Sequence, residues 1–210
     1  MIGDRPVSPR AGLSREAVVE AAASLADEKG LEVVTLTALA FELGIRTPSL
    51  YNHVAGLEGL RRELTLLGVR ELGQRLSRAA AGKATDEGIF GLAQAYRAFV
   101  RERPGLYAAT VRSYRLSHPE DPQLAQAEGQ AFEPVLAVLA SYGLSGEEAV
   151  HAARGLRSVA HGFATLEVAG GFGIALDPEE SFVRLLQAFT TGLRERDGSE
   201  SEGASGSERI

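Results

Sequence analysis

Apolar residues recur every three or four positions along almost the whole chain, and this period restricts the fold more than any other feature. No segment shows the strict alternation of apolar and polar residues that a half-buried strand requires. The clearest helical stretch covers residues 85–103 and is followed by Pro104, which breaks a helix. Its apolar side chains are Ile89, Leu92, Ala93, Tyr96, Phe99 and Val100. The pattern predicts an all-α protein.

Capping residues divide this pattern into separate helices. Helices are expected over residues 14–30 and 35–44, each with a hydroxyl residue as N-cap and a glycine at its C-terminal end. A third should open at Thr47-Pro48, where the threonine can cap and proline fits the first turn. Longer helices are then expected over residues 57–80, 85–103, 106–116, 124–142, 145–170 and 177–194. Pro134 should kink or divide the helix that contains it.

The composition excludes several classes of protein. The 210 residues contain no Cys, which rules out disulfides, thiolate metal sites and a cysteine nucleophile. The four His are scattered and no acid–base or nucleophile constellation emerges, so we expect no metal, no cofactor and no enzyme activity. The chain has no apolar run of about 20 residues and no signal-peptide block at its start, which predicts a cytoplasmic protein without a membrane segment.

The three N-terminal helices have the arrangement of a helix-turn-helix unit. Two short helices are joined by residues 44–46 and follow a longer helix against which they can pack. The second short helix of such a unit can enter the major groove of DNA, while the first crosses the phosphate backbone. Four hydroxyl groups can donate to phosphate oxygens without any net charge: those of Thr35, Thr37, Thr47 and Ser49.

Residues 35–60, TLTALAFELGIRTPSLYNHVAGLEGL, resemble the DNA-binding signature of the TetR family of transcriptional regulators. With the preceding helix, the resemblance covers residues 12–62. The resemblance implies a homodimer that binds a palindromic operator. It also implies that a small-molecule effector binds the C-terminal domain and thereby releases the DNA. It also implies that Leu50 and Val54 pack inward, as their spacing of four on a helix independently suggests. The residues it implies at the DNA are Thr35, Thr37, Arg46, Thr47, Pro48, Ser49, Tyr51, Asn52 and His53.

Several of these positions have a second interpretation. Tyr51 could be a half-buried aromatic residue, His53 could simply cap a helix end, and Asn52 could either bind an adenine edge or stay solvated. Two positions depart from the family pattern. Leu57 stands where many members have a lysine, and Arg46 stands where serine is frequent. The first change removes a phosphate contact, and Arg46 can replace it.

The C-terminal half carries a partial resemblance to a TetR effector-domain subclass named for a Trp…His-Gly pattern. Residues 158–166 contain the His-Gly pair, but the Trp is missing. One face of this helix carries Arg154, Arg157, His161 and Thr165, which form either a solvated or dimer-facing stripe or the polar end of a pocket. Aromatic residues elsewhere are either core or pocket wall. The candidate effector residues are Tyr96, Phe99, Tyr107, Phe132 and His161.

Charge bears directly on DNA binding, because the chain has a net charge of −6 and a pI of about 5.3. Residues 1–62 contain seven basic and eight acidic side chains, so the N-terminal part is not basic either. No acid lies between Ile45 and Leu57, where Arg46 is the sole fixed cation. We therefore expect few ionic contacts with phosphate and many neutral hydrogen bonds.

The sequence predicts four segments along the chain. They are a flexible arm (1–11), a helix-turn-helix DNA-binding domain (12–62), an effector-binding and dimerisation domain (63–195) and a disordered Gly/Ser-rich tail (196–210). The last two long helices, at about 145–170 and 177–194, are the expected dimer contact. The expected function is a sequence-specific repressor released by a small, largely apolar effector. The alternatives are a helical small-molecule-binding or enzyme-like domain with no DNA role, and a DNA-binding regulator without an effector.

Overall fold

A computed structural model describes residues 13–111 and 120–204, and every regular element in these two stretches is a helix. The helices are α1 (Arg15–Lys29), the 3-10 helix η1 (Leu31–Val33), α2 (Leu36–Glu42), α3 (Thr47–Leu50), α4 (Gly56–Ala80), α5 (Thr85–Glu102), α6 (Pro104–Val111), α8 (Pro122–Ala140), α9 (Gly146–Val168) and α10 (Pro178–Ala204). The all-α prediction is confirmed for these residues. The predicted N-terminal arm and the predicted end of the 106–116 helix lie outside them.

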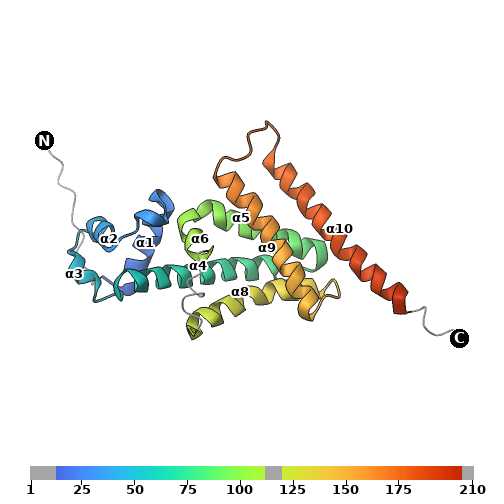
Figure 1. Cartoon of the computed structure of the whole chain (residues 1–210), viewed down its shortest axis with the longest axis horizontal. Helices are drawn as coiled ribbons and strands as arrows, with labels where there is room; N and C mark the ends of the chain where they lie inside the picture. Colours follow the sequence, from blue (N-terminus) through green and yellow to red (C-terminus); the bar gives the residue numbers. More distant parts are fainter. Residues whose placement is uncertain (1–12, 112–119, 205–210) are drawn as a thin grey trace.

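The helices are arranged around α4, which runs along much of the molecule (Figure 1). α1, α2 and α3 lie at one end of α4, and α5, α6 and α8 pack along its length. α9 packs against α5 and α8, and α10 packs against α9 and α5. The predicted domain boundary at residues 62–63 falls inside α4, so one continuous helix belongs to both ends of the molecule. Among the described residues, no helix combines the length and apolar content needed to cross a lipid bilayer.

Glycines on α4 allow neighbouring helices to approach it closely. A Cβ atom added at Gly68 would lie 2.5 Å from Thr110 Cγ2 of α6, and one added at Gly73 would lie 3.0 Å from Ala131 Cα of α8. From sequence, these glycines only weaken the helix, by about 1 kcal/mol each relative to alanine. In the folded protein they are the positions at which α6 and α8 cross α4.

Two predicted helix caps are confirmed and one is wrong. The hydroxyl oxygens of Ser14 and Thr35 each accept a hydrogen bond from a backbone N–H of the following turn at 3.1 Å. Thr47 is not a cap, because the carbonyl of Arg46 already accepts from the N–H of Ser49 at 2.9 Å. Arg46 is therefore the N-cap residue of α3, and Thr47 is its first helical residue. Ser145 occupies the N-cap position of α9, but its side chain makes no capping hydrogen bond.

Pro134 lies inside α8, which is one helix from Pro122 to Ala140, so of the predicted kink or division the division does not occur. Packing against α4 and α9 holds both halves of the helix in place. α10 continues to Ala204, so the backbone of residues 196–204 is helical where a disordered tail is predicted. Extending an existing helix costs little, because each added residue contributes a backbone hydrogen bond. The rest of the predicted tail, residues 205–210, lies outside the described chain.

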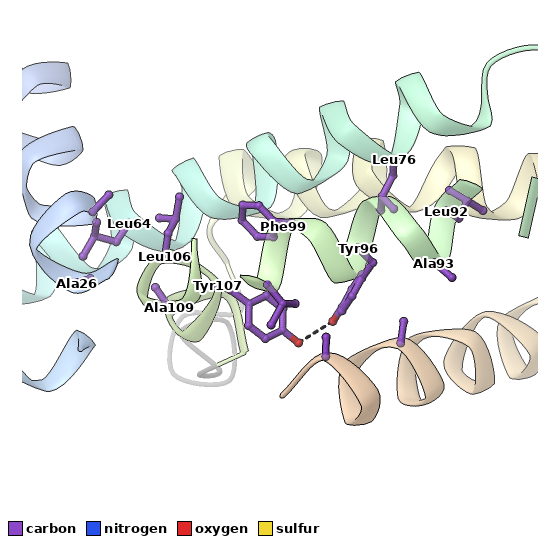
Figure 2. Packing of buried hydrophobic residues seen from close by; sticks show 14 of the residues in the cluster. Ala26, Leu64, Leu76, Leu92, Ala93, Tyr96, Phe99, Leu106, Tyr107 and Ala109 are labelled. Carbon is purple, nitrogen blue, oxygen red and sulfur yellow. Dashed lines mark hydrogen bonds between the residues drawn. The ribbon is translucent and has the colours of Figure 1, made fainter. Parts of the chain in front are cut away.

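The larger of two hydrophobic clusters among the described residues extends from the N-terminal helices into the helical body, and the smaller one lies between α4 and α8. Figure 2 shows Ala26 of α1 near Leu64 of α4, with Leu106 of α6 close to both. All three side chains are buried. Because α1, α4 and α6 share this core, the N-terminal unit packs directly on the body and is not merely joined to it through the chain.

Candidate functional site

The turn between α2 and α3 is closed by a glycine in the left-handed region. Gly44 has φ 64°, and its N–H donates to the carbonyl of Phe41 at 3.1 Å. The next N–H, that of Ile45, donates to the carbonyl of Ala40 at 3.0 Å. These two bonds form a Schellman motif, which ends a helix most readily when the left-handed residue is glycine. The motif sets the direction in which α3 leaves α2.

α3 and the turns that follow it separate inward from outward side chains. Leu50 is completely buried and Val54 is 5% exposed, whereas Tyr51 between them is 62% exposed. Ser49 and Asn52 are also exposed, and His53 is half-buried. The inward positions of Leu50 and Val54 agree with the prediction from their spacing. The half-buried interpretation of Tyr51 is wrong in this chain, since most of its ring faces solvent.

Residues 47–54, called the recognition segment below because they hold most of the candidate DNA contacts, form a less regular helix than the sequence suggests. The α-helix ends at Leu50, and residues 51–53 continue it as turns closed by i+3 hydrogen bonds. The N–H of Tyr51 donates to the carbonyl of Pro48 at 3.3 Å, and the N–H of His53 donates to that of Leu50 at 2.9 Å. Such 3-10 geometry is common at helix ends and tightens the segment.

The remaining candidate DNA contacts are also accessible. Thr37, Arg46 and Pro48 are exposed, and Thr47 is half-buried. Thr35 is exposed, and although its hydroxyl oxygen already caps α2, its O–H can still donate to a phosphate. The structure thus brings the exposed candidates onto two short helices joined by one tight turn. This arrangement fits a groove-binding helix-turn-helix unit.

α1 is fastened to α6 by a carboxylate and a close backbone contact. Asp27 accepts hydrogen bonds from Arg103 Nε at 2.6 Å and from the N–H of Leu106 at 2.9 Å. A Cβ added at Gly105 would lie only 2.1 Å from the carbonyl carbon of Ala26. α6 therefore rests against the backbone of α1.

A second ionic cluster joins α1 and α4 to the start of α8. Arg62 donates to both carboxylate oxygens of Asp121, at 2.5 and 2.9 Å. The carboxylate of Glu63 accepts from Arg62 at 2.7 Å and from Arg15 at 2.5 Å. The guanidinium of Arg62 lowers the pKa of Asp121, which is also the N-cap of α8. The sequence contains no signal for this pair, because its partners are 59 residues apart.

A pocket of about 940 Å³ lies between α4, α5, α8 and α9. Its size is within the range of sites for small organic ligands. Most of its wall is aliphatic or aromatic, with a few polar groups. The wall includes Leu72, Leu76, Leu92, Tyr96, Glu128, Phe132, Val135, Arg154, Leu156 and Arg157.

The predicted effector residues fall into two groups. Tyr96 and Phe132 line the pocket, whereas Phe99, Tyr107 and His161 are not part of its wall. Phe99 is completely buried beneath the guanidinium of Arg75, so the alternative interpretation of this residue as core is correct. Its aromatic neighbours made it resemble a pocket residue, but only the packing of α5 decides which side it faces.

A chain of hydrogen bonds leads from the pocket wall to α9. The hydroxyls of Tyr96 and Tyr107 are 2.7 Å apart (Figure 2), and the hydroxyl of Tyr107 is hydrogen-bonded to Nδ1 of His161. Burial raises the pKa of Tyr107, which therefore remains a neutral phenol. Three predicted residues are thus brought together, although only Tyr96 reaches the pocket.

The fold and the two sites define a class of protein: a helix-turn-helix unit packed on a helical domain that holds a ligand-sized pocket. Residues 89–189 match the family described as tetracyclin repressor-like, C-terminal domain. The chain is 38% identical over 192 residues to the uncharacterized HTH-type transcriptional regulator Rv0681 of Mycobacterium tuberculosis, covering 91% of this chain and 87% of that protein. It is 36% identical over 188 residues to the uncharacterized HTH-type transcriptional regulator YobS of Bacillus subtilis, covering 89% and 96%.

Solved structures agree at the level of the fold. The crystal structure of apo ActR from Streptomyces coelicolor superposes with a TM-score of 0.69 at 19% identity. The match covers 91% of this chain and 100% of ActR. The TetR family regulator PfmR from Thermus thermophilus gives a TM-score of 0.64 at 19% identity, covering 83% and 97%. This chain belongs to the TetR family of transcriptional regulators and is a DNA-binding regulator.

Proposed function

We propose that this protein is a dimeric repressor that reads a palindromic operator through α3 and the N-terminal end of α2. The observation that carries this proposal is the contrast between Tyr51 and Leu50, one exposed and one buried on the same short segment. An exposed tyrosine next to Ser49 and Asn52, on a surface without acids, is suited to contacts with bases and phosphates. In this proposal the DNA-binding and effector domains meet at residues 62–63 and share α4.

The dimer contact in this proposal is formed by α9 and α10. Supporting it, large apolar side chains are exposed on these helices, namely Leu166 and Val168 at the end of α9 and Leu185 on α10. A pairing of the two helices with their copies would cover this surface, as closed two-fold dimers do. It would also place two recognition segments on one DNA duplex, with half-sites about one helical turn apart.

The effector in this proposal is a small organic molecule that enters the pocket between α4, α5, α8 and α9. Binding there can release DNA only if the ligand prefers a conformation in which the two recognition segments no longer fit the operator. α4 lines the pocket and also carries the helix-turn-helix unit at its N-terminal end. We assign the protein no enzyme activity and no cofactor, and we place its action in the cytoplasm, where its operator DNA would lie.

Selection of genomic fragments by the purified protein, followed by sequencing, tests this proposal. The expected result is enrichment of a short palindrome, with one dimer bound to each site when its mass is measured by light scattering. Tyr51→Ala serves as the matched comparison and should enrich the same palindrome more weakly. Enrichment of random fragments by both proteins would contradict the proposal and would favour a helical ligand-binding domain without a DNA role.

A further inference from the structure

We infer that the pocket between α4, α5, α8 and α9 takes an amphipathic organic anion: an apolar body of aliphatic or aromatic carbon that carries one carboxylate or sulfonate. This inference rests on the proposed effector function and narrows the ligand class from largely apolar to apolar and anionic. It depends on how apolar and charged side chains are distributed around the pocket.

The apolar part of the pocket is built by four helices. Leu72 and Leu76 come from α4, Leu92 from α5, Val135 from α8 and Leu156 from α9. Phe132 adds an aromatic ring that is 37% exposed, although phenylalanine in a monomeric helical body is usually buried. A wall of this kind binds a carbon skeleton by removing both surfaces from water.

The charged part of the pocket comes mainly from α9. Arg154 and Arg157 are spaced i,i+3, so both guanidinium groups rise from the same face of the helix and both line the pocket. Among the described residues, neither side chain has an ion pair or a hydrogen-bond partner. Arg157 is also close enough to Tyr107 to oppose the burial that raises the pKa of that phenol.

The more buried arginines of the helical body, unlike Arg154 and Arg157, have carboxylate partners. Arg97, which is 3% exposed, is held by the carboxylates of Glu167 and Glu179 and lies over two phenylalanine rings. Arg103 is paired with Asp27. Arg154 and Arg157 are exposed, and what distinguishes them is that both line one apolar pocket with no carboxylate partner among the described residues. A guanidinium binds a carboxylate or sulfonate through paired, charge-assisted hydrogen bonds.

The sign of the charge decides between ligand classes. Among the described residues that line the pocket, two are arginines and one is an acid, Glu128, so this part of the wall has a positive fixed charge. A cationic ligand would place a third positive charge beside Arg154 and Arg157. A neutral ligand would gain no charge-assisted hydrogen bond from Arg154 and Arg157, which are exposed and would stay hydrated. An anion on an apolar body satisfies both halves of the pocket.

Two fluorescent probes that share one aromatic body test the inference. 1-Anilinonaphthalene-8-sulfonate carries the anionic group, and N-phenyl-1-naphthylamine lacks it. We expect the sulfonate to bind the full-length protein more tightly. The double variant Arg154→Gln/Arg157→Gln should lose about tenfold or more in affinity for the sulfonate and change less than about twofold for the neutral probe. Retention of the neutral probe also shows that the pocket of the variant is intact.

Two further variants locate the effect. Arg78→Gln/Arg184→Gln removes the same charge from exposed positions outside the pocket and should leave both affinities unchanged. Gly129→Leu places a side chain at the pocket wall, where an added Cβ meets no atom within 4 Å, and should weaken both probes. Equal affinity for the two probes, or full sulfonate binding by Arg154→Gln/Arg157→Gln, would overturn the inference.

Operator release separates this inference from the proposed function. If both probes release operator DNA with equal potency, the effector function stands and the anionic class is wrong. If the sulfonate binds through Arg154 and Arg157 but leaves operator affinity unchanged, the ligand class stands and the pocket is not an effector site. Release by the sulfonate alone, lost in Arg154→Gln/Arg157→Gln, supports both.

Discussion

At the scale of single residues, the recognition segment shows how far helical spacing alone can be trusted. Leu50 and Val54 are four positions apart, and any helix-like conformation places them on one face, so their burial could be predicted locally. The exposure of Tyr51 does not follow in the same way, because at about 100° per residue Tyr51 lies at the edge of that face, and only the folded chain shows that it is 62% exposed. Phe99 and Phe132 cannot be separated in this way, since both lie on apolar stripes and only tertiary packing decides which one reaches the pocket.

Because Tyr51 is exposed, we expect its substitution to weaken DNA binding and to leave the stability of the fold unchanged. Tyr51→Ala should change the free energy of unfolding by no more than about 0.5 kcal/mol, because the side chain has few packing contacts to lose. Its affinity for the selected operator should fall by about tenfold, as expected for one lost side-chain contact with DNA. Thermal unfolding and fluorescence anisotropy measure the two effects.

Leu50→Ala is the matched comparison on the same segment. Its side chain is fully buried, so the substitution should cost about 2–5 kcal/mol of stability. A thermal stability of Tyr51→Ala as low as that of Leu50→Ala would show that Tyr51 is a structural residue.

At the scale of helices, the sequence does not reveal where two helices approach each other closely. Gly68 and Gly73 interrupt a good helical pattern, and their local effect is unfavourable. Gly105 is the second residue of α6, directly after Pro104, and looks like an ordinary helix breaker. In the folded chain, these positions admit Thr110, Ala131 and the backbone of Ala26. The reason for each glycine lies on another helix.

The Arg62–Asp121 pair between α4 and α8 predicts an acid-sensitive contact. The pKa of Asp121 is lower in the folded chain than in the unfolded chain, so unfolding takes up protons as the pH falls. The stabilisation is therefore present above about pH 4 and is lost as the pH falls below it. Asp121→Asn, which can still cap α8, should lower stability at pH 7 by about 1–3 kcal/mol and reduce the loss of stability on acidification. Thermal unfolding from pH 7 to acidic pH measures both.

Glu58→Gln is the control for this experiment. Glu58 pairs with Arg61 on the same helix, but both side chains are more than half exposed. Such a surface pair contributes little, so the variant should unfold like the parent protein at every pH. If Asp121→Asn also matched the parent, the pair would not contribute to holding α8 on α4.

At the scale of the whole molecule, an acidic protein has to bind a polyanion. The net charge is −6, yet the surface of α3 carries no acid, and Arg46 stands exposed at its start. Neutral donors from Thr37, Ser49 and Asn52 are therefore expected to supply much of the contact with phosphate. Long-range repulsion by the acidic body would slow encounter without changing these local bonds.

This charge distribution predicts a shallow dependence of operator binding on salt. Each phosphate neutralised by a cation contributes about −0.9 to the slope of log K against log salt. With few fixed cations at the interface, the slope should stay well below the value for a strongly basic regulator. Anisotropy titrations between about 50 and 200 mM salt measure it. A slope equivalent to ten or more ion pairs would contradict the prediction.

The sequence by itself determined the helical class, most helix positions and the inward side of the segment from Thr47 to Val54, because these depend on interactions within a few residues. The motif in residues 35–60 also identified the family. Only the tertiary structure decided that Arg62 meets Asp121, that glycines admit neighbouring helices, and that Arg154 and Arg157 line a pocket with Phe132 while Phe99 is core. These relations join residues far apart in the chain, and local periodicity contains no information about which helices meet.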